Sequence, residues 1–99
     1  MQEGISVILP TLNRANYLAT TVDCLMEQDF GLPYEIIIVD QSASIDDVMA
    51  GRAKDSGTFI RYYHVTEFKG LPEARNFGEQ HAQYAYVLFL DCLLYTSPS

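Results

Sequence analysis

The stretch EIIIVD, residues 35–40, decides the fold. It keeps β-branched apolar residues on consecutive positions and ends abruptly in an acid. Two further runs resemble it, ISVIL at 5–9 and YVLFL at 86–90, and Asp91 follows the second. Near-continuous apolar runs are typical of strands covered on both faces, as in a parallel α/β sheet. Because ligands of such sheets bind outside the carboxyl ends of the strands, Asp40 and Asp91 are predicted to border a ligand.

Helical patterns and turns separate these runs. Leu18, Val22 and Leu25 recur on one helix face, and Ser44 followed by Asp47 resembles a capping box that would start a second helix. Gly51 weakens that second helix. The predicted strands cover about residues 5–9, 34–39, 59–65 and 85–90, and the predicted helices about 15–28, 45–55 and 72–83. This alternating order implies parallel strands with right-handed crossovers, and the mixed strand at 59–65 is expected near an edge.

The charge balance argues against one class of partner. The chain has 99 residues, which is one domain at most, with 13 acidic residues against 6 basic ones. Its net charge is −7. Because non-specific nucleic-acid binding needs Lys and Arg to neutralise phosphates, we expect no nucleic-acid partner.

Cys24 and Cys92 are interpreted as free thiols in a reducing compartment. With two scattered histidines they give no zinc-ligand spacing. The first twenty residues show no signal peptide, and no apolar stretch reaches the roughly 18 residues that a membrane helix needs. A cytoplasmic location is therefore expected.

Several common nucleotide and hydrolase motifs are absent. The chain has no G-x-G-x-x-G after its first strand, no G-x-x-x-x-G-K-[ST], and no G-x-S-x-G. Dinucleotide oxidoreductases, P-loop enzymes and α/β-hydrolases are therefore poorly supported.

Four blocks together resemble the inverting family 2 glycosyltransferases. They are ISVILPTLNR at 5–14, IIIVDQS at 36–42, ARN at 74–76 and VLFLD at 87–91. The resemblance implies the Rossmann-like nucleotide-binding half of a GT-A fold, an α/β unit with strand order 3-2-1-4 and three helices. It also implies transfer of a sugar from a nucleotide-sugar, usually a UDP- or dTDP-sugar, to an acceptor hydroxyl with inversion. The acceptor is unknown.

The resemblance also implies roles for individual residues. Pro10 and Thr11 match the turn that borders the nucleotide base, and Asp40 matches the acid that accepts a hydrogen bond from the base, commonly from uracil N3–H. An ionised carboxylate is chemically suited to that proton. Arg75 matches a residue near base and phosphates, where its guanidinium can pair with phosphate or stack. The family usually reads Asp-Asp-Gly-Ser where this chain has Asp40 followed by Gln41, so one charge is missing.

A metal pair implied by the resemblance is incomplete here. Asp91 matches the first acid of an Asp-x-Asp motif and is expected to be a nucleotide-sugar-binding residue. In that motif one acid lies near the ribose and the other holds Mg²⁺ or Mn²⁺ against the diphosphate. The second acid is replaced by Leu93, which has no oxygen ligand in its side chain. We expect an intact parent protein to bind Mg²⁺ or Mn²⁺, and we expect neither ion to bind this chain tightly.

Residues 92–99, CLLYTSPS, follow neither helix nor strand pattern and resemble a translated sequencing adapter of a metagenomic reading frame. The interpretation is that residues 1–91 are the N-terminal part of the glycosyltransferase domain and 92–99 a non-native tail. The acceptor site and catalytic base would follow Asp91 in a parent protein, which can associate with the cytoplasmic face of the membrane. No catalytic residue is assigned, and the chain as given is expected to be inactive.

Two other classes remain open at this point. A flavodoxin-like or receiver-like module also ends its strands in acids. A receiver, however, requires an acid pair after its first strand, where this chain has Thr11. A nucleotidyltransferase would carry a Gly-rich basic loop there, for which Arg14 alone is a thin substitute. His64, His81 and the tyrosines, Tyr62 among them, are assigned to packing or surface positions.

Overall fold

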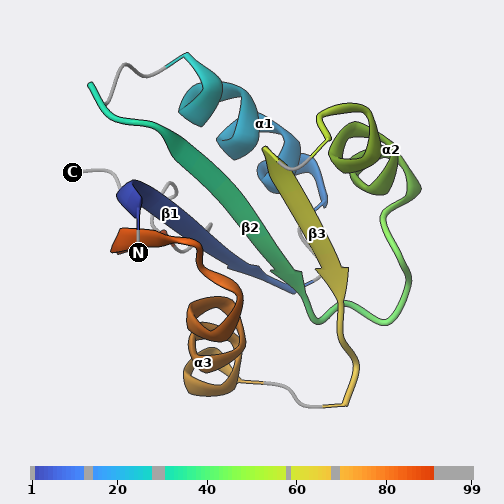
Figure 1. Cartoon of the computed structure of the whole chain (residues 1–99). Helices are drawn as coiled ribbons and strands as arrows, with labels where there is room; N and C mark the ends of the chain where they lie inside the picture. Colours follow the sequence, from blue (N-terminus) through green and yellow to red (C-terminus); the bar gives the residue numbers. More distant parts are fainter. Residues whose placement is uncertain (1, 13–14, 28–30, 58, 68–69, 91–99) are drawn as a thin grey trace, which may run out of the picture.

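The structure is a computed structural model that describes residues 2–12, 15–27, 31–57, 59–67 and 70–90. Strands and helices alternate along the chain, as predicted (Figure 1). The elements are β1 (Gln2–Thr11), α1 (Ala15–Met26), β2 (Tyr34–Asp40), α2 (Asp47–Asp55), β3 (Ile60–His64), α3 (Leu71–His81) and β4 (Tyr84–Phe89).

The four strands form one parallel sheet in the order β3-β2-β1-β4. This confirms the predicted order, and β3 lies at an edge as expected. The register sets Thr11 of β1 opposite Asp40 of β2, and Asp40 opposite His64 of β3. Because parallel strands all end at the same edge, these three residues stand in a row there.

Helices cover the central strands on both faces. In Figure 1, α1 and α2 lie on one side of the sheet and α3 on the other. Alternate residues of each central strand enter two separate cores, which explains why their apolar runs are continuous. The core under α1 and α2 includes Val7, Leu9, Leu18, Val22, Ile36, Ile38 and Met49, and the core under α3 includes Ile8, Ile37, Val39, Val65 and Ala74.

The third apolar run does not behave like the other two. The side chains of Tyr86, Val87 and Leu88 in β4 are 56%, 36% and 39% exposed. The expectation of a strand buried on both faces was therefore wrong for β4. Its neighbour in the described sheet is β1 alone. Phe89 at the end of β4 and the following Leu90 pack against the two cores.

The start of α2 also differs from the prediction. The N-cap is Asp46, whose side chain accepts a hydrogen bond from the backbone N–H of Met49 at 3.1 Å. Ser44, the predicted cap, lies exposed in the preceding loop. Asp is among the strongest N-cap residues, and the Tyr62 hydroxyl accepts the backbone N–H of Asp46. This replaces the reciprocal bond that a capping box would have supplied.

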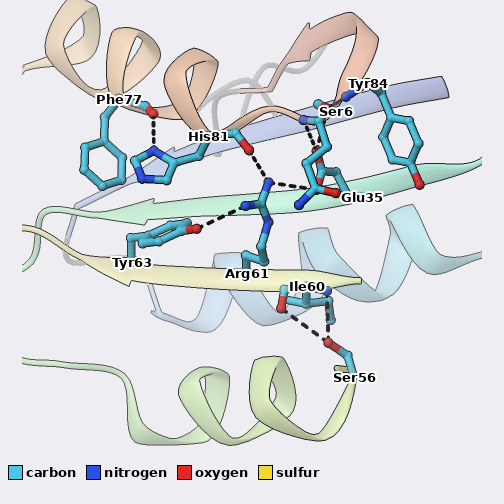
Figure 2. Close-up of polar contacts among 10 residues, drawn as sticks. Ser6, Glu35, Ser56, Ile60, Arg61, Tyr63, Phe77, His81 and Tyr84 are labelled. Atoms are coloured by element: carbon cyan, nitrogen blue, oxygen red, sulfur yellow. Dashed lines mark hydrogen bonds and ion pairs between the residues drawn. The ribbon is translucent and has the colours of Figure 1, made fainter. Parts of the chain in front are cut away.

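A buried polar network joins all four strands away from the carboxyl edge (Figure 2). Glu35 is 3% exposed and accepts hydrogen bonds from the Ser6 hydroxyl at 2.6 Å and the Gln83 backbone N–H at 2.8 Å. The Arg61 guanidinium forms an ion pair with Glu35 at 2.8 Å and donates to the His81 carbonyl. The burial cost of the carboxylate is thus offset by three donors, which also fix the chain where it enters β4.

Two helical glycines should respond oppositely to alanine. A Cβ at Gly51 would meet nothing within 4 Å, whereas one at Gly78 would lie 2.5 Å from Cγ2 of the fully buried Ile8. We expect Gly51→Ala to raise the free energy of unfolding by about 0.5–1 kcal/mol, as helix propensity dictates. Gly78→Ala should lower it by about 1–3 kcal/mol through overpacking. Urea unfolding followed by circular dichroism measures both, and stabilisation by Gly78→Ala would contradict this packing.

The network around Glu35 predicts a large effect at Arg61. Arg61→Ala leaves a buried carboxylate without its cation, so we expect a loss of about 3 kcal/mol in the free energy of unfolding. The matched control is Lys54→Ala, an exposed cation of α2, which should change it by less than about 0.5 kcal/mol. Equal effects in urea unfolding would show that the Glu35–Arg61 pair contributes little.

Candidate functional site

A cavity of about 470 Å³ opens at the carboxyl edge of the sheet, between the ends of β1 and β2 and the loop that leads to α2. Its volume falls in the range of small-molecule sites. Thr11 and Asp40, two of the predicted site residues, both line it. The described lining residues are Thr11, Leu18, Asp40, Ser42, Ala43, Ser44, Ile45, Asp46, Asp47 and Val48.

Asp40 is held rigidly at the end of β2. Its side chain is 3% exposed, and each carboxylate oxygen accepts one hydrogen bond from the protein. The backbone N–H of Ser42 donates to Oδ1 at 2.9 Å, and the hydroxyl of Tyr62 donates to Oδ2 at 2.5 Å. An ionised carboxylate offers about four lone-pair positions, so Asp40 can accept further donors from a ligand.

Thr11 presents an unpaired hydroxyl beside Asp40. Thr11 is 6% exposed, and its Oγ1 has no hydrogen-bond partner in the described part of the chain. Its carbonyl accepts the backbone N–H of Gln41 at 2.9 Å, so the backbone is satisfied while the side chain is not. A buried hydroxyl without a partner costs stability, and a ligand in the cavity would supply one.

Two residues of β3 hold the wall of the cavity. Tyr62 and His64 lie on the same face of the strand, and the Tyr62 hydroxyl accepts the backbone N–H of Asp46 at 2.8 Å. His64 Nε2 donates to the carbonyl of Ser42 at 2.7 Å. Burial raises the pKa of the Tyr62 hydroxyl, and its hydrogen bond to Asp40 raises the pKa further, so the phenol keeps its proton. Sequence reasoning assigned both residues to packing and missed these contacts.

Gln41 connects the cavity loop to α3. Its side chain is buried, and its amide both donates to the Gly70 carbonyl at 3.0 Å and accepts the Gly70 N–H at 3.3 Å. Gly70 caps α3 with φ 154°, a conformation that favours glycine. Gln41 stands where the resembling family carries a second acid, and here it closes a two-way amide bridge instead.

Arg75 lies apart from the cavity. It is exposed on α3, which covers the other face of the sheet, and its guanidinium carbon is 5.2 Å from the ring centroid of Phe89. This is cation–π distance at the end of β4. The end of β4 is two strand spacings from the end of β2, roughly 10 Å. Arg75 and Asp40 thus lie two strands apart along the carboxyl edge, with Arg75 on the α3 side of the sheet.

Pro10 is buried and is the second-to-last residue of β1, directly before Thr11. Near the carboxyl edge, the Leu90 N–H after β4 donates to the Ile8 carbonyl of β1 at 3.0 Å. Pro10 lies beyond this bond, so its missing N–H costs the ladder nothing there.

Two predicted metal-site positions, Asp91 and Leu93, lie outside the described residues. Within residues 2–12, 15–27, 31–57, 59–67 and 70–90, no group of three His, Cys, Asp or Glu side chains is arranged to hold a metal ion. The described residues therefore do not by themselves form the divalent-cation site that the resemblance implies.

Comparison with known proteins gives a consistent result. The family model described as Glycosyl transferase family 2 matches residues 6–95. The chondroitin synthase of Escherichia coli is 34% identical over 99 residues, covering 97% of this chain and 14% of that protein. The mannosyltransferase PcManGT from Pyrobaculum calidifontis, solved with GDP-Man and Mn²⁺, superposes with TM-score 0.74 and 26% identity over 93% of this chain and 28% of its own. The structure of S. aureus TarS 1-349 with UDP-GlcNAc superposes with a TM-score of 0.71 and is 28% identical, covering 90% of this chain and 26% of the TarS chain.

The amide bridge predicts the effect of a near-isosteric change. Gln41→Glu keeps an acceptor for the Gly70 N–H but sets a carboxylate oxygen against the Gly70 carbonyl, so we expect a loss of about 1–3 kcal/mol in the free energy of unfolding. Hydrogen exchange at the Gly70 amide should also become faster. The control Gln80→Glu, on the exposed face of α3, should change stability by less than about 0.5 kcal/mol. An unchanged urea midpoint for Gln41→Glu would contradict the bridge.

Proposed function

Because the chain belongs to glycosyl transferase family 2, we propose that a protein containing it transfers a sugar from a nucleotide-sugar donor to an acceptor hydroxyl with inversion. The chain spans 14% of the chondroitin synthase it matches. The part of the reaction assigned to it is therefore binding of the donor nucleotide. Family membership argues against the flavodoxin-like, receiver-like and nucleotidyltransferase alternatives.

The observation that carries this proposal is the pairing of Asp40 with Thr11 in one cavity. Asp40 is a fixed acceptor for an N–H of the base, and the Thr11 hydroxyl, unpaired within the described residues, is suited to a neighbouring base carbonyl. Leu18 supplies an apolar wall. A uracil or thymine ring offers an N3–H flanked by carbonyls, so a UDP- or dTDP-sugar is the proposed donor. The similar TarS structure contains UDP-GlcNAc, and the similar mannosyltransferase contains GDP-Man.

Arg75 is proposed to contact the phosphates at the β4 end of the carboxyl edge. Its position over Phe89 leaves the guanidinium exposed at the carboxyl end of β4, where a diphosphate extending from the base cavity would pass. A guanidinium binds phosphate oxygens through two parallel N–H groups. Pro10 shapes the end of β1 between the two regions.

The metal and the catalytic base are not assigned to described residues. Mg²⁺ or Mn²⁺ would neutralise charge on the departing nucleotide, and Asp91, the first acid of the incomplete pair, is proposed as a nucleotide-sugar-binding residue. The Leu93 side chain supplies no oxygen ligand for the metal. Residues 1–91 are the proposed nucleotide-binding unit and 92–99 the proposed tail.

The location of the protein is also a proposal. No helix among the described residues combines the length and the apolarity that crossing a bilayer requires. We place the nucleotide-binding unit in the cytoplasm or at the cytoplasmic face of the membrane, where sugar nucleotides are available to it.

Titration with UDP tests the assignment of Asp40. Loss of a hydrogen bond to a charged acceptor costs about 1.5–3 kcal/mol, so Asp40→Ala should weaken UDP binding by roughly 10- to 100-fold in calorimetry. The matched control is Asp55→Ala, which removes an exposed carboxylate at the end of α2 and should leave the Kd unchanged. Equal UDP affinity of the Asp40→Ala variant and wild type, or no binding by a folded wild type, would refute this function for the cavity.

A further inference from the structure

The hydroxyl of Tyr62 sits between two groups that leave it one orientation. It lies 2.8 Å from the backbone N–H of Asp46, which can only donate, and 2.5 Å from Oδ2 of Asp40. A phenol has a single proton, so that proton must point at Asp40 while a lone pair accepts from Asp46. The direction of both hydrogen bonds is therefore determined by chemistry rather than by choice of rotamer.

The same contact fixes the loop that lines the cavity. The Ser42 N–H is bound by Asp40, the Ser42 carbonyl by His64, and the Asp46 N–H by Tyr62. Asp46 in turn caps α2. Tyr62 thus links the end of β2 to the start of α2, where Asp40 and Asp46 both line the cavity.

We propose that Tyr62 is a positioning residue that sets selectivity for bases carrying an N–H opposite Asp40. This inference rests on the proposed function, because it needs a base bound at Asp40. With Tyr62 and Ser42 each donating to one oxygen, the carboxylate plane cannot turn, and its remaining lone pairs point in fixed directions. A base with an N–H there gains an aligned hydrogen bond. A base methylated at that nitrogen meets only acceptors.

Tyr62 has a matched control in the next residue. Tyr63 faces the other side of the sheet, where its hydroxyl accepts from Arg61 Nη1 at 3.2 Å and its ring packs against Phe77 and His81 (Figure 2). Tyr63→Phe removes the bond from Arg61 to its phenol, and Tyr62→Phe removes both its bond to Asp40 and the bond it accepts from the Asp46 N–H. Only Tyr62→Phe removes a donor to Asp40.

The experiment compares UDP with N3-methyl-UDP by calorimetry, using the whole 99-residue chain and checking the fold of each variant by circular dichroism. Wild type should prefer UDP. Tyr62→Phe should lower that preference about tenfold, through weaker UDP binding with the affinity for N3-methyl-UDP unchanged. Tyr63→Phe should keep the wild-type preference, and Asp40→Ala should abolish it.

The outcomes separate this inference from the proposed function. Suppose that Asp40→Ala abolishes the preference for UDP. If Tyr62→Phe then keeps this preference, or weakens the binding of both ligands equally, the role of Tyr62 is refuted while that of Asp40 stands. If wild type shows no preference, both fail. A second readout needs no variant: with ¹³C-labelled tyrosine, the Tyr62 ring signal should shift on adding UDP more than on adding N3-methyl-UDP. Identical shifts with the two ligands would also refute the inference.

Discussion

The parallel pairing of β1 with β2, in the register that sets Thr11 opposite Asp40, is the constraint from which the site follows. Parallel strands end at one edge, so the segments after β1, β2 and β3 meet there. A shift by one residue would turn the Thr11 side chain to the face covered by α3 and separate it from Asp40. A polar contact supports this register, since the Ser6 hydroxyl of β1 donates at 2.6 Å to Glu35, the residue opposite it on β2.

Most of the fold could be predicted because apolar periodicity reports directly on elements with two covered faces. The runs ending at Leu9 and Asp40 belong to central strands, and their continuous apolar residues correctly indicate burial on both faces. The run at 86–90 has the same composition, yet its middle residues are exposed, because burial depends on neighbours that a local pattern does not contain. The cap of α2 shows a similar limit, since Ser44 and Asp46 are both good N-cap residues and a tertiary contact from Tyr62 favours the second.

In the candidate site too, local sequence patterns predict some residues, and tertiary contacts alone identify the others. Thr11 and Asp40 end predicted strands, so sequence alone could place them at the edge, and the structure brings them into one cavity. Tyr62 and Gln41 act through partners 22 and 29 residues away in the chain. Nothing local distinguishes Tyr62 from Tyr63, and only the position of β3 beside β2 gives one of them a carboxylate to hold. From sequence alone, Gln41 in place of an acid indicates a weakened motif. The structure shows that its amide forms two hydrogen bonds with the Gly70 backbone.

The placement of β1 in the sheet has a consequence for the order of events during synthesis. β1 is made first, yet one of its two partners, β4, begins about eighty residues later, where Tyr84 pairs with Gln2. At ribosomal rates of 5–20 residues per second, β1 waits on the order of 4–16 s for that partner. No hairpin can form meanwhile, because every pairing in the sheet crosses a helix. The nascent chain therefore carries an open strand edge for seconds, which is the interval in which a chaperone would have to bind it.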